Sequence, residues 1–139
     1  MKLKKEKILI IGISFFIFFL EIITNIITES STQYIEEKFK RVNYDLSSIK
    51  DMNKEGDRYN EFKNSIEDKI KDLKENWFLE QNKLSYFSEH DELEKVSKCL
   101  ISLEENVKNE EFEIALEEGS EFEYWLKHIK EKDKLELKK

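Results

Sequence analysis

The fold is decided first by the apolar stretch ILIIGISFFIFFLEIITNII, which runs from Ile8 to Ile27. Fifteen of its positions are Ile, Leu or Phe, and a helix of this length rises about 30 Å, the thickness of a bilayer core. These side chains contribute roughly −5 to −9 kcal/mol to membrane insertion, whereas a carboxylate such as Glu21 costs about 2.5 to 3.5 kcal/mol at mid-bilayer. Glu21 lies about 9 Å of helical rise from Ile27, which favours an interfacial position. We therefore predict a transmembrane helix over residues 8–27.

A cleavable signal peptide is the alternative interpretation, because lysines precede the apolar run. Cleavage, however, favours small residues in an A-x-A-like pattern, and after Leu20 the chain continues EIITNII. We therefore expect an uncleaved anchor in the cell membrane. Residues 1–7 contain four lysines, whereas the first basic residue beyond the span is Lys38. The positive-inside rule then places residues 1–7 in the cytoplasm and the C-terminal domain outside it.

The remainder of the chain has the composition of an all-helical domain. The sequence has 139 residues, three glycines, no proline and 40% charged residues, which suits long surface-exposed helices. About 110 residues follow the anchor, enough for one small core. The formal net charge is −7, and because residues 1–27 carry +2, the rest carries −9. A domain with this charge repels phosphate backbones, so nucleic-acid binding is excluded.

Four segments beyond residue 28 carry apolar residues at steps of mostly three and four, the pattern of a helix with one buried face. Leu84 and Phe87 extend the second series before its phase is lost. The four series are Tyr34, Ile35, Phe39, Val42, Leu46 and Ile49; Tyr59, Phe62, Ile66, Ile70, Leu73 and Trp77; Leu93, Val96, Leu100, Leu103 and Val107; and Phe112, Ala115, Leu116, Phe122, Trp125, Leu126 and Ile129.

The connections between these series define two helical hairpins. Gly56 suits a helix C-cap and Asp57 the next N-cap. A second break falls between Glu80 and Asp91, where the apolar phase changes, and a third at residues 108–111. We predict a small bundle of two hairpins over residues 28–131 and a frayed charged tail over residues 132–139.

The first hairpin places a constraint on its second helix. If the two helices pack antiparallel about a turn at residues 54–56, Trp77 lies level with Thr32 at the membrane surface, and Phe87 lies level with Ile22 inside the bilayer. The second helix is therefore expected to end or turn away within residues 81–88.

The candidate chemistry is limited to one polar group. In a second hairpin turning near residues 108–109, His90, Glu92 and His128 meet at the membrane-proximal end, and two histidines with a carboxylate are a ligand set that binds zinc. A polar cluster that forms hydrogen bonds across the hairpin is the favoured interpretation, so no metal or cofactor is assigned. No glycine-rich phosphate loop or Ser-His-Asp arrangement stands out, which predicts a protein that is not an enzyme.

Two further residues have structural interpretations. Trp77 lies on an apolar face, which favours core packing over ligand stacking. Cys99 is the only cysteine, which excludes an intramolecular disulfide. It is expected beside the core, with an intermolecular disulfide as the alternative.

These residues resemble a known family. A lysine-flanked anchor, a helix with Trp77, His90-x-Glu92 before an apolar helix, Ala115-Leu116 and finally His128-Ile129 are similar to domain of unknown function 4363, found in small membrane-anchored proteins of Gram-positive spore formers. The resemblance marks Trp77, His90, Glu92 and His128 as shared positions and implies no activity, because the family has none assigned. Members tend to end with an Asn-Ile-type segment, where this chain has DKLEL at residues 133–137.

The function expected from the sequence is a protein-interaction module at the outer face of the membrane. Its partners are the membrane itself and another envelope protein, bound through a hairpin groove, and homo-oligomer formation is left open. The alternative is a site at His90, Glu92 and His128 that responds to divalent ions or protons.

Overall fold

The computed structural model describes residues 2–137, with side chains from Lys4 to Lys132. The described residues form four helices and no strand, which confirms the predicted all-α class. The helices are α1 (Lys2–Lys50), α2 (Asp57–Leu84), α3 (His90–Lys108) and α4 (Phe112–Leu137).

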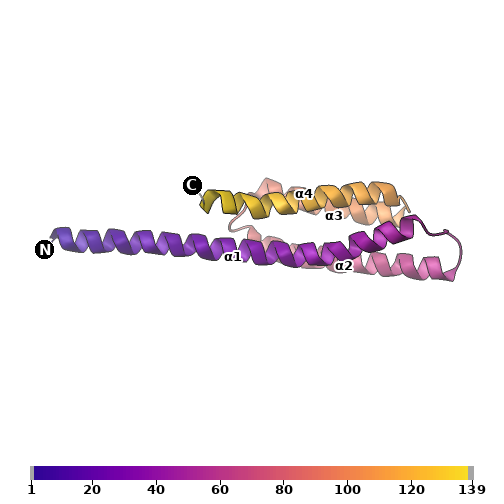
Figure 1. Cartoon of the computed structure of the whole chain (residues 1–139), viewed down its shortest axis with the longest axis horizontal. Coiled ribbons are helices and arrows are strands. Elements are labelled where there is room, and N and C mark those ends of the chain that lie inside the picture. Colours follow the sequence, from indigo (N-terminus) through magenta and orange to yellow (C-terminus); the bar gives the residue numbers. More distant parts are fainter. Residues whose placement is uncertain (1, 138–139) are drawn as a thin grey trace.

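The helices form an antiparallel four-helix bundle. Helix α1 packs against α2 and α4, and α3 packs against the same two helices. The predicted hairpins are α1 with α2 and α3 with α4, and they close on each other through α1 with α4 and α2 with α3. The N-terminal part of α1 extends far beyond the bundle, at the end where the α2–α3 connection and the end of α4 also lie (Figure 1). This end is called the proximal end below.

The predicted apolar faces form the core. Tyr34 and Phe87 are exposed, with 42% and 39% of their surface accessible, and Phe62, Leu116 and Trp125 are partly buried against the core. The Phe39 and Phe122 rings lie 4.9 Å apart and join α1 to α4, and a Cβ on Gly119 would approach the Phe39 ring to 2.9 Å. A glycine therefore allows α1 and α4 to pack closely here. The buried apolar residues are Ile35, Phe39, Val42, Leu46 and Ile49; Tyr59, Ile66, Ile70, Leu73, Trp77 and Leu84; Leu93, Val96, Cys99, Leu100, Leu103 and Val107; and Phe112, Ala115, Phe122, Leu126 and Ile129.

Helix α1 joins the apolar stretch to the bundle without a break. The boundary expected at residues 27 and 28 has no loop, and Thr28 and Thr32 are buried in the bundle. The Thr32 hydroxyl donates to the Thr28 carbonyl at 2.7 Å, so this side chain bonds back to its own helix instead of interrupting it. Among the described residues, α1 is the only helix long and apolar enough to cross a membrane, with a window of mean hydropathy 2.3 that lies outside the bundle.

The connections differ from the prediction at Gly56. Helix α1 ends at Lys50, and Gly56, with φ of 104°, is the N-cap of α2 instead of a C-cap, so Asp57 is the first helical residue. Glycine is suited to this position because a positive φ is strained for other residues. The second and third breaks, at residues 85–89 and 109–111, fall where the sequence predicts them. Helix α2 ends at Leu84, inside the expected window of residues 81–88.

The charged C-terminal residues are part of α4. The helix continues to Leu137, so the expected frayed tail is helical through this residue, and residues 138–139 lie outside the described chain. Lysine, glutamate and leucine are strong helix formers. In addition, the Lys132 ammonium lies 2.7 Å from the Glu89 carboxylate and ties α4 to the start of α3.

Candidate functional site

An ionic group joins α3 to α4 at the proximal end. Glu92 is 8% exposed, and its Oε1 lies 3.1 Å from His128 Nε2 and 3.2 Å from Lys132 Nζ. The hydrogen bond from Lys132 lowers the pKa of Glu89, while the bond to Glu89 raises the pKa of Lys132. A nearly buried carboxylate thus has two cationic or polar partners, which offsets the cost of its burial.

His90 is not part of this group. It is the first residue of α3 and is exposed, and no hydrogen bond or ion pair joins it to Glu92 or His128. The α3–α4 turn is centred nearly two residues later than the expected residues 108–109, in a connection where Glu110 takes a positive φ of 60°. The pairs Glu92–His128 and Glu89–Lys132 then place His90 level with residues 130–131. The structure brings together two of the three predicted residues.

The aromatic rings of Tyr124 and Trp125 lie beside the His128 ring on α4. The Tyr124 and Trp125 rings meet edge to face at 5.2 Å, and the Trp125 and His128 rings do so at 5.5 Å. The Lys95 ammonium lies 4.1 Å from the centre of the Trp125 ring, a cation–π contact between α3 and α4. Tyr124 is 60% exposed. We call Lys95, Tyr124, Trp125 and His128 the aromatic cluster. Sequence reasoning missed it, because Lys95 reaches Trp125 only in the observed register.

Trp77 is a core residue, as the sequence suggests. It is fully buried, and its indole N–H donates to the Ser97 hydroxyl at 2.8 Å. That hydroxyl also lies 3.2 Å from the Gln81 amide oxygen and from the Leu93 carbonyl. The side chain therefore fixes α2 against α3, and no part of it is available to a ligand.

A second polar group, which the sequence did not predict, lies around Cys99. Its Sγ and one carboxylate oxygen each from Glu118 and Glu121 lie within 4.8 Å of one another, the only such group of three potential metal ligands in the described part of the chain. Burial raises the pKa of the Cys99 thiol to about 11, helped by the two carboxylates. Because the thiolate is the metal ligand, the Cys99 thiol would have to lose its proton before it could bind a metal.

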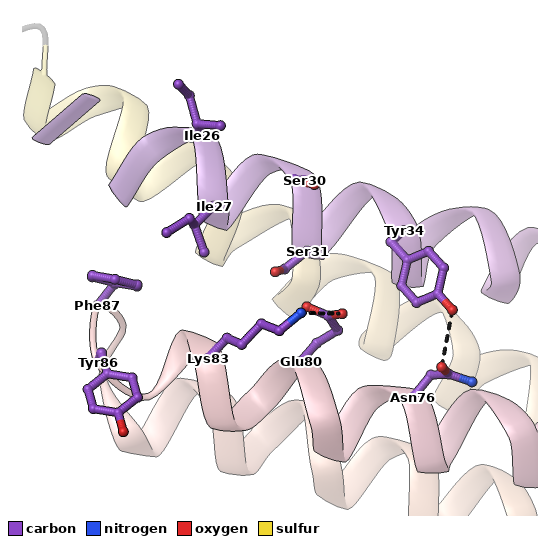
Figure 2. A pocket seen from close by; sticks show the side chains of 10 residues that line it. All are labelled: Ile26, Ile27, Ser30, Ser31, Tyr34, Asn76, Glu80, Lys83, Tyr86 and Phe87. Carbon is purple, nitrogen blue, oxygen red and sulfur yellow. Dashed lines mark hydrogen bonds and ion pairs between the residues drawn. The ribbon is translucent and has the colours of Figure 1, made fainter. Parts of the chain in front are cut away.

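A cleft separates α1 from α2 at the proximal end (Figure 2). Its volume is about 670 Å³, and its inner end, toward the apolar stretch of α1, is apolar, with Ile27 pointing toward Phe87 of the α2–α3 connection. Its outer end is polar, where the Tyr34 hydroxyl donates to the Asn76 amide oxygen at 3.1 Å. The remaining lining residues are Ser30, Ser31, Glu80, Lys83, Tyr86 and Phe87.

The protein is therefore an antiparallel four-helix bundle whose first helix extends beyond it as a long apolar helix. The chain belongs to the family described as "Domain of unknown function (DUF4363)", whose model matches residues 22–139. This match confirms the resemblance found in the sequence. The matched region begins inside the apolar stretch and includes the whole bundle. No curated protein and no solved structure matches the chain.

Proposed function

We propose that this chain is a single-pass membrane protein whose bundle lies at the outer face of the cell membrane and binds another envelope protein without catalysing a reaction. The continuity of α1 supports this function, because the apolar helix and one wall of the bundle are a single helix of 49 residues. The lysines before the apolar stretch support an N-terminus in the cytoplasm.

The aromatic cluster is the observation that favours a protein partner. Tyrosine and tryptophan are enriched among the residues that dominate binding energy at protein interfaces. The contact between Phe39 and Phe122 places Trp125 level with about residue 36 of α1. That level is about 14 Å of helical rise beyond Ile27, outside the hydrocarbon and beyond a headgroup layer of roughly 5 to 8 Å. Another protein reaches this surface more readily than lipid does.

Photocrosslinking in native membranes tests this function. A photoreactive amino acid replaces Tyr124 in the full-length chain, and the control replaces Tyr44, which is 74% exposed on α1. The proposal predicts one discrete protein adduct at position 124, absent at position 44 and lost when Trp125→Ala is added. Equal adducts at both positions, or none at position 124, contradict it.

A second candidate function is a response to protons or divalent ions. It is favoured by the 3.1 Å contact between His128 and Glu92, since histidine is the side chain that ordinarily changes charge between pH 5 and 8. Calorimetric titration of the full-length protein in detergent with zinc, manganese and nickel tests the ion response. Saturable micromolar binding that His128→Ala abolishes supports it, and its absence removes it.

A further inference from the structure

The α2–α3 connection carries apolar side chains at the proximal end. Tyr86 is 84% exposed and Phe87 is 39% exposed. Leu79 and Phe78, two turns earlier on α2, are 64% and 41% exposed. The Tyr86 and Phe87 rings lie 6.4 Å apart and form a patch that lines the inner end of the cleft (Figure 2).

The position of this patch relative to a membrane follows from α1. If the span ends near Ile27, the headgroup layer adds roughly 5 to 8 Å on the outer side, or about three to five helical residues. Ile27 and Phe87 point toward each other across the cleft (Figure 2), so the α2–α3 connection lies level with the outer end of the hydrocarbon. Because α1 has no break between span and bundle, the bundle has no hinge on which to lift away.

The polarity of the cleft agrees with this level. Its inner end is apolar. The Tyr34–Asn76 hydrogen bond and the Lys83–Glu80 ion pair lie further from the apolar stretch of α1, toward the middle of the bundle. A bilayer interface has the same gradient, from hydrocarbon through headgroups to water. Tyrosine is enriched at this level because its ring is apolar and its hydroxyl polar.

We propose that the α2–α3 connection is a second membrane contact, in which Tyr86 and Phe87 insert into the outer-leaflet interface beside α1. Acyl chains fill the apolar inner end of the cleft, and Lys83 remains in the headgroup layer. The bundle is thereby held at a fixed tilt and height on the membrane. This inference depends on the membrane anchor of the proposed function and is independent of the protein partner.

Depth-dependent fluorescence quenching tests the contact. Single cysteines replace Tyr86 or Phe87 in full-length chains that carry Cys99→Ser, and an environment-sensitive fluorophore is attached before reconstitution into vesicles of phosphatidylcholine and phosphatidylglycerol. Some vesicles contain lipids with a nitroxide on the acyl chain. Asn53, in the exposed α1–α2 connection at the far end, is the water control, and Ile17 is the membrane control. Circular dichroism verifies that each variant is helical.

The proposal predicts that nitroxide lipids quench probes at positions 86 and 87 several-fold more than a probe at position 53. If position 17 is quenched and positions 86 and 87 behave like position 53, the second contact is wrong and the anchor stands. If position 17 is not quenched either, both the anchor and the contact are wrong. Iodide in the buffer quenches probes that are exposed to water. If neither iodide nor nitroxide lipid quenches the probes at positions 86 and 87, these side chains lie against protein, and the proposal is wrong.

Discussion

Replacement of Leu103 by alanine tests the packing of the bundle. Leu103 lies on α3, is fully buried and belongs to the core. The change removes three carbons, for which burial contributes about 2.5 kcal/mol, and the remaining cavity raises the cost to about 2 to 5 kcal/mol. A small domain is stable by about 5 to 15 kcal/mol in total, so the variant loses a large share of its stability.

Ile101 is the matched control, because it lies two residues earlier on the same helix and is 45% exposed. Alanine there removes the same number of carbons from a half-exposed position and gains helix propensity, so its cost is at most about 1 kcal/mol. Urea unfolding of the full-length chain in a mild detergent, followed by circular dichroism, measures both changes in the free energy of unfolding. An Ile101→Ala cost equal to or above that of Leu103→Ala would mean that α3 presents its other face to the core.

Four further substitutions have expected outcomes in the same unfolding assay. Trp77→Phe costs about 1 to 3 kcal/mol, since it removes the hydrogen bond to Ser97 and leaves a cavity; an unchanged midpoint would contradict its burial. His128→Ala costs about 1 kcal/mol, whereas His90→Ala, at an exposed position, changes stability by less than about 0.5 kcal/mol. A chelator that destabilises the parent but not the His128 variant would indicate a bound metal instead. Burial and a hydrogen bond from its hydroxyl raise the pKa of Tyr59 from 10.0 to about 12. The stability that this shift contributes is complete below pH 10.0 and is lost as the pH rises through about 12. Tyr59→Phe is therefore expected to show less alkaline destabilisation than the parent; equal destabilisation would refute the assignment.

The helices and their buried faces could be predicted because they depend on local spacing. Residues three and four apart share a helix face in any fold, so the series that contain Leu46 or Leu103 identify core positions before their partners are known. The change of phase after Trp77 likewise locates the second break, which the structure places after Leu84. In the same way, Trp77 was expected in the core on the basis of its own helix alone.

The candidate site was predicted only in part because it depends on the register between helices. That register is set at the α3–α4 turn, where Glu110 adopts a positive φ. Glutamate rarely adopts this conformation, so the sequence does not predict it. The hydrogen bond from the Tyr59 hydroxyl to Glu110 at 2.9 Å, between residues 51 positions apart, helps to hold this conformation. A small displacement of the turn removes His90 from the group and creates the contact between Lys95 and Trp125. The spacing of residues within one helix does not show which residues of another helix they contact.

The proposed membrane anchor and orientation of the chain are tested most directly by cysteine labelling on intact cells. Ser120 is exposed on α4, so a Ser120→Cys variant that also carries Cys99→Ser presents one accessible thiol on the bundle. The proposal predicts that a membrane-impermeant maleimide labels this full-length chain on intact cells to the same extent as after lysis. Labelling only after lysis would place the bundle in the cytoplasm, and a mature protein that begins beyond Leu20 would show that the anchor is removed.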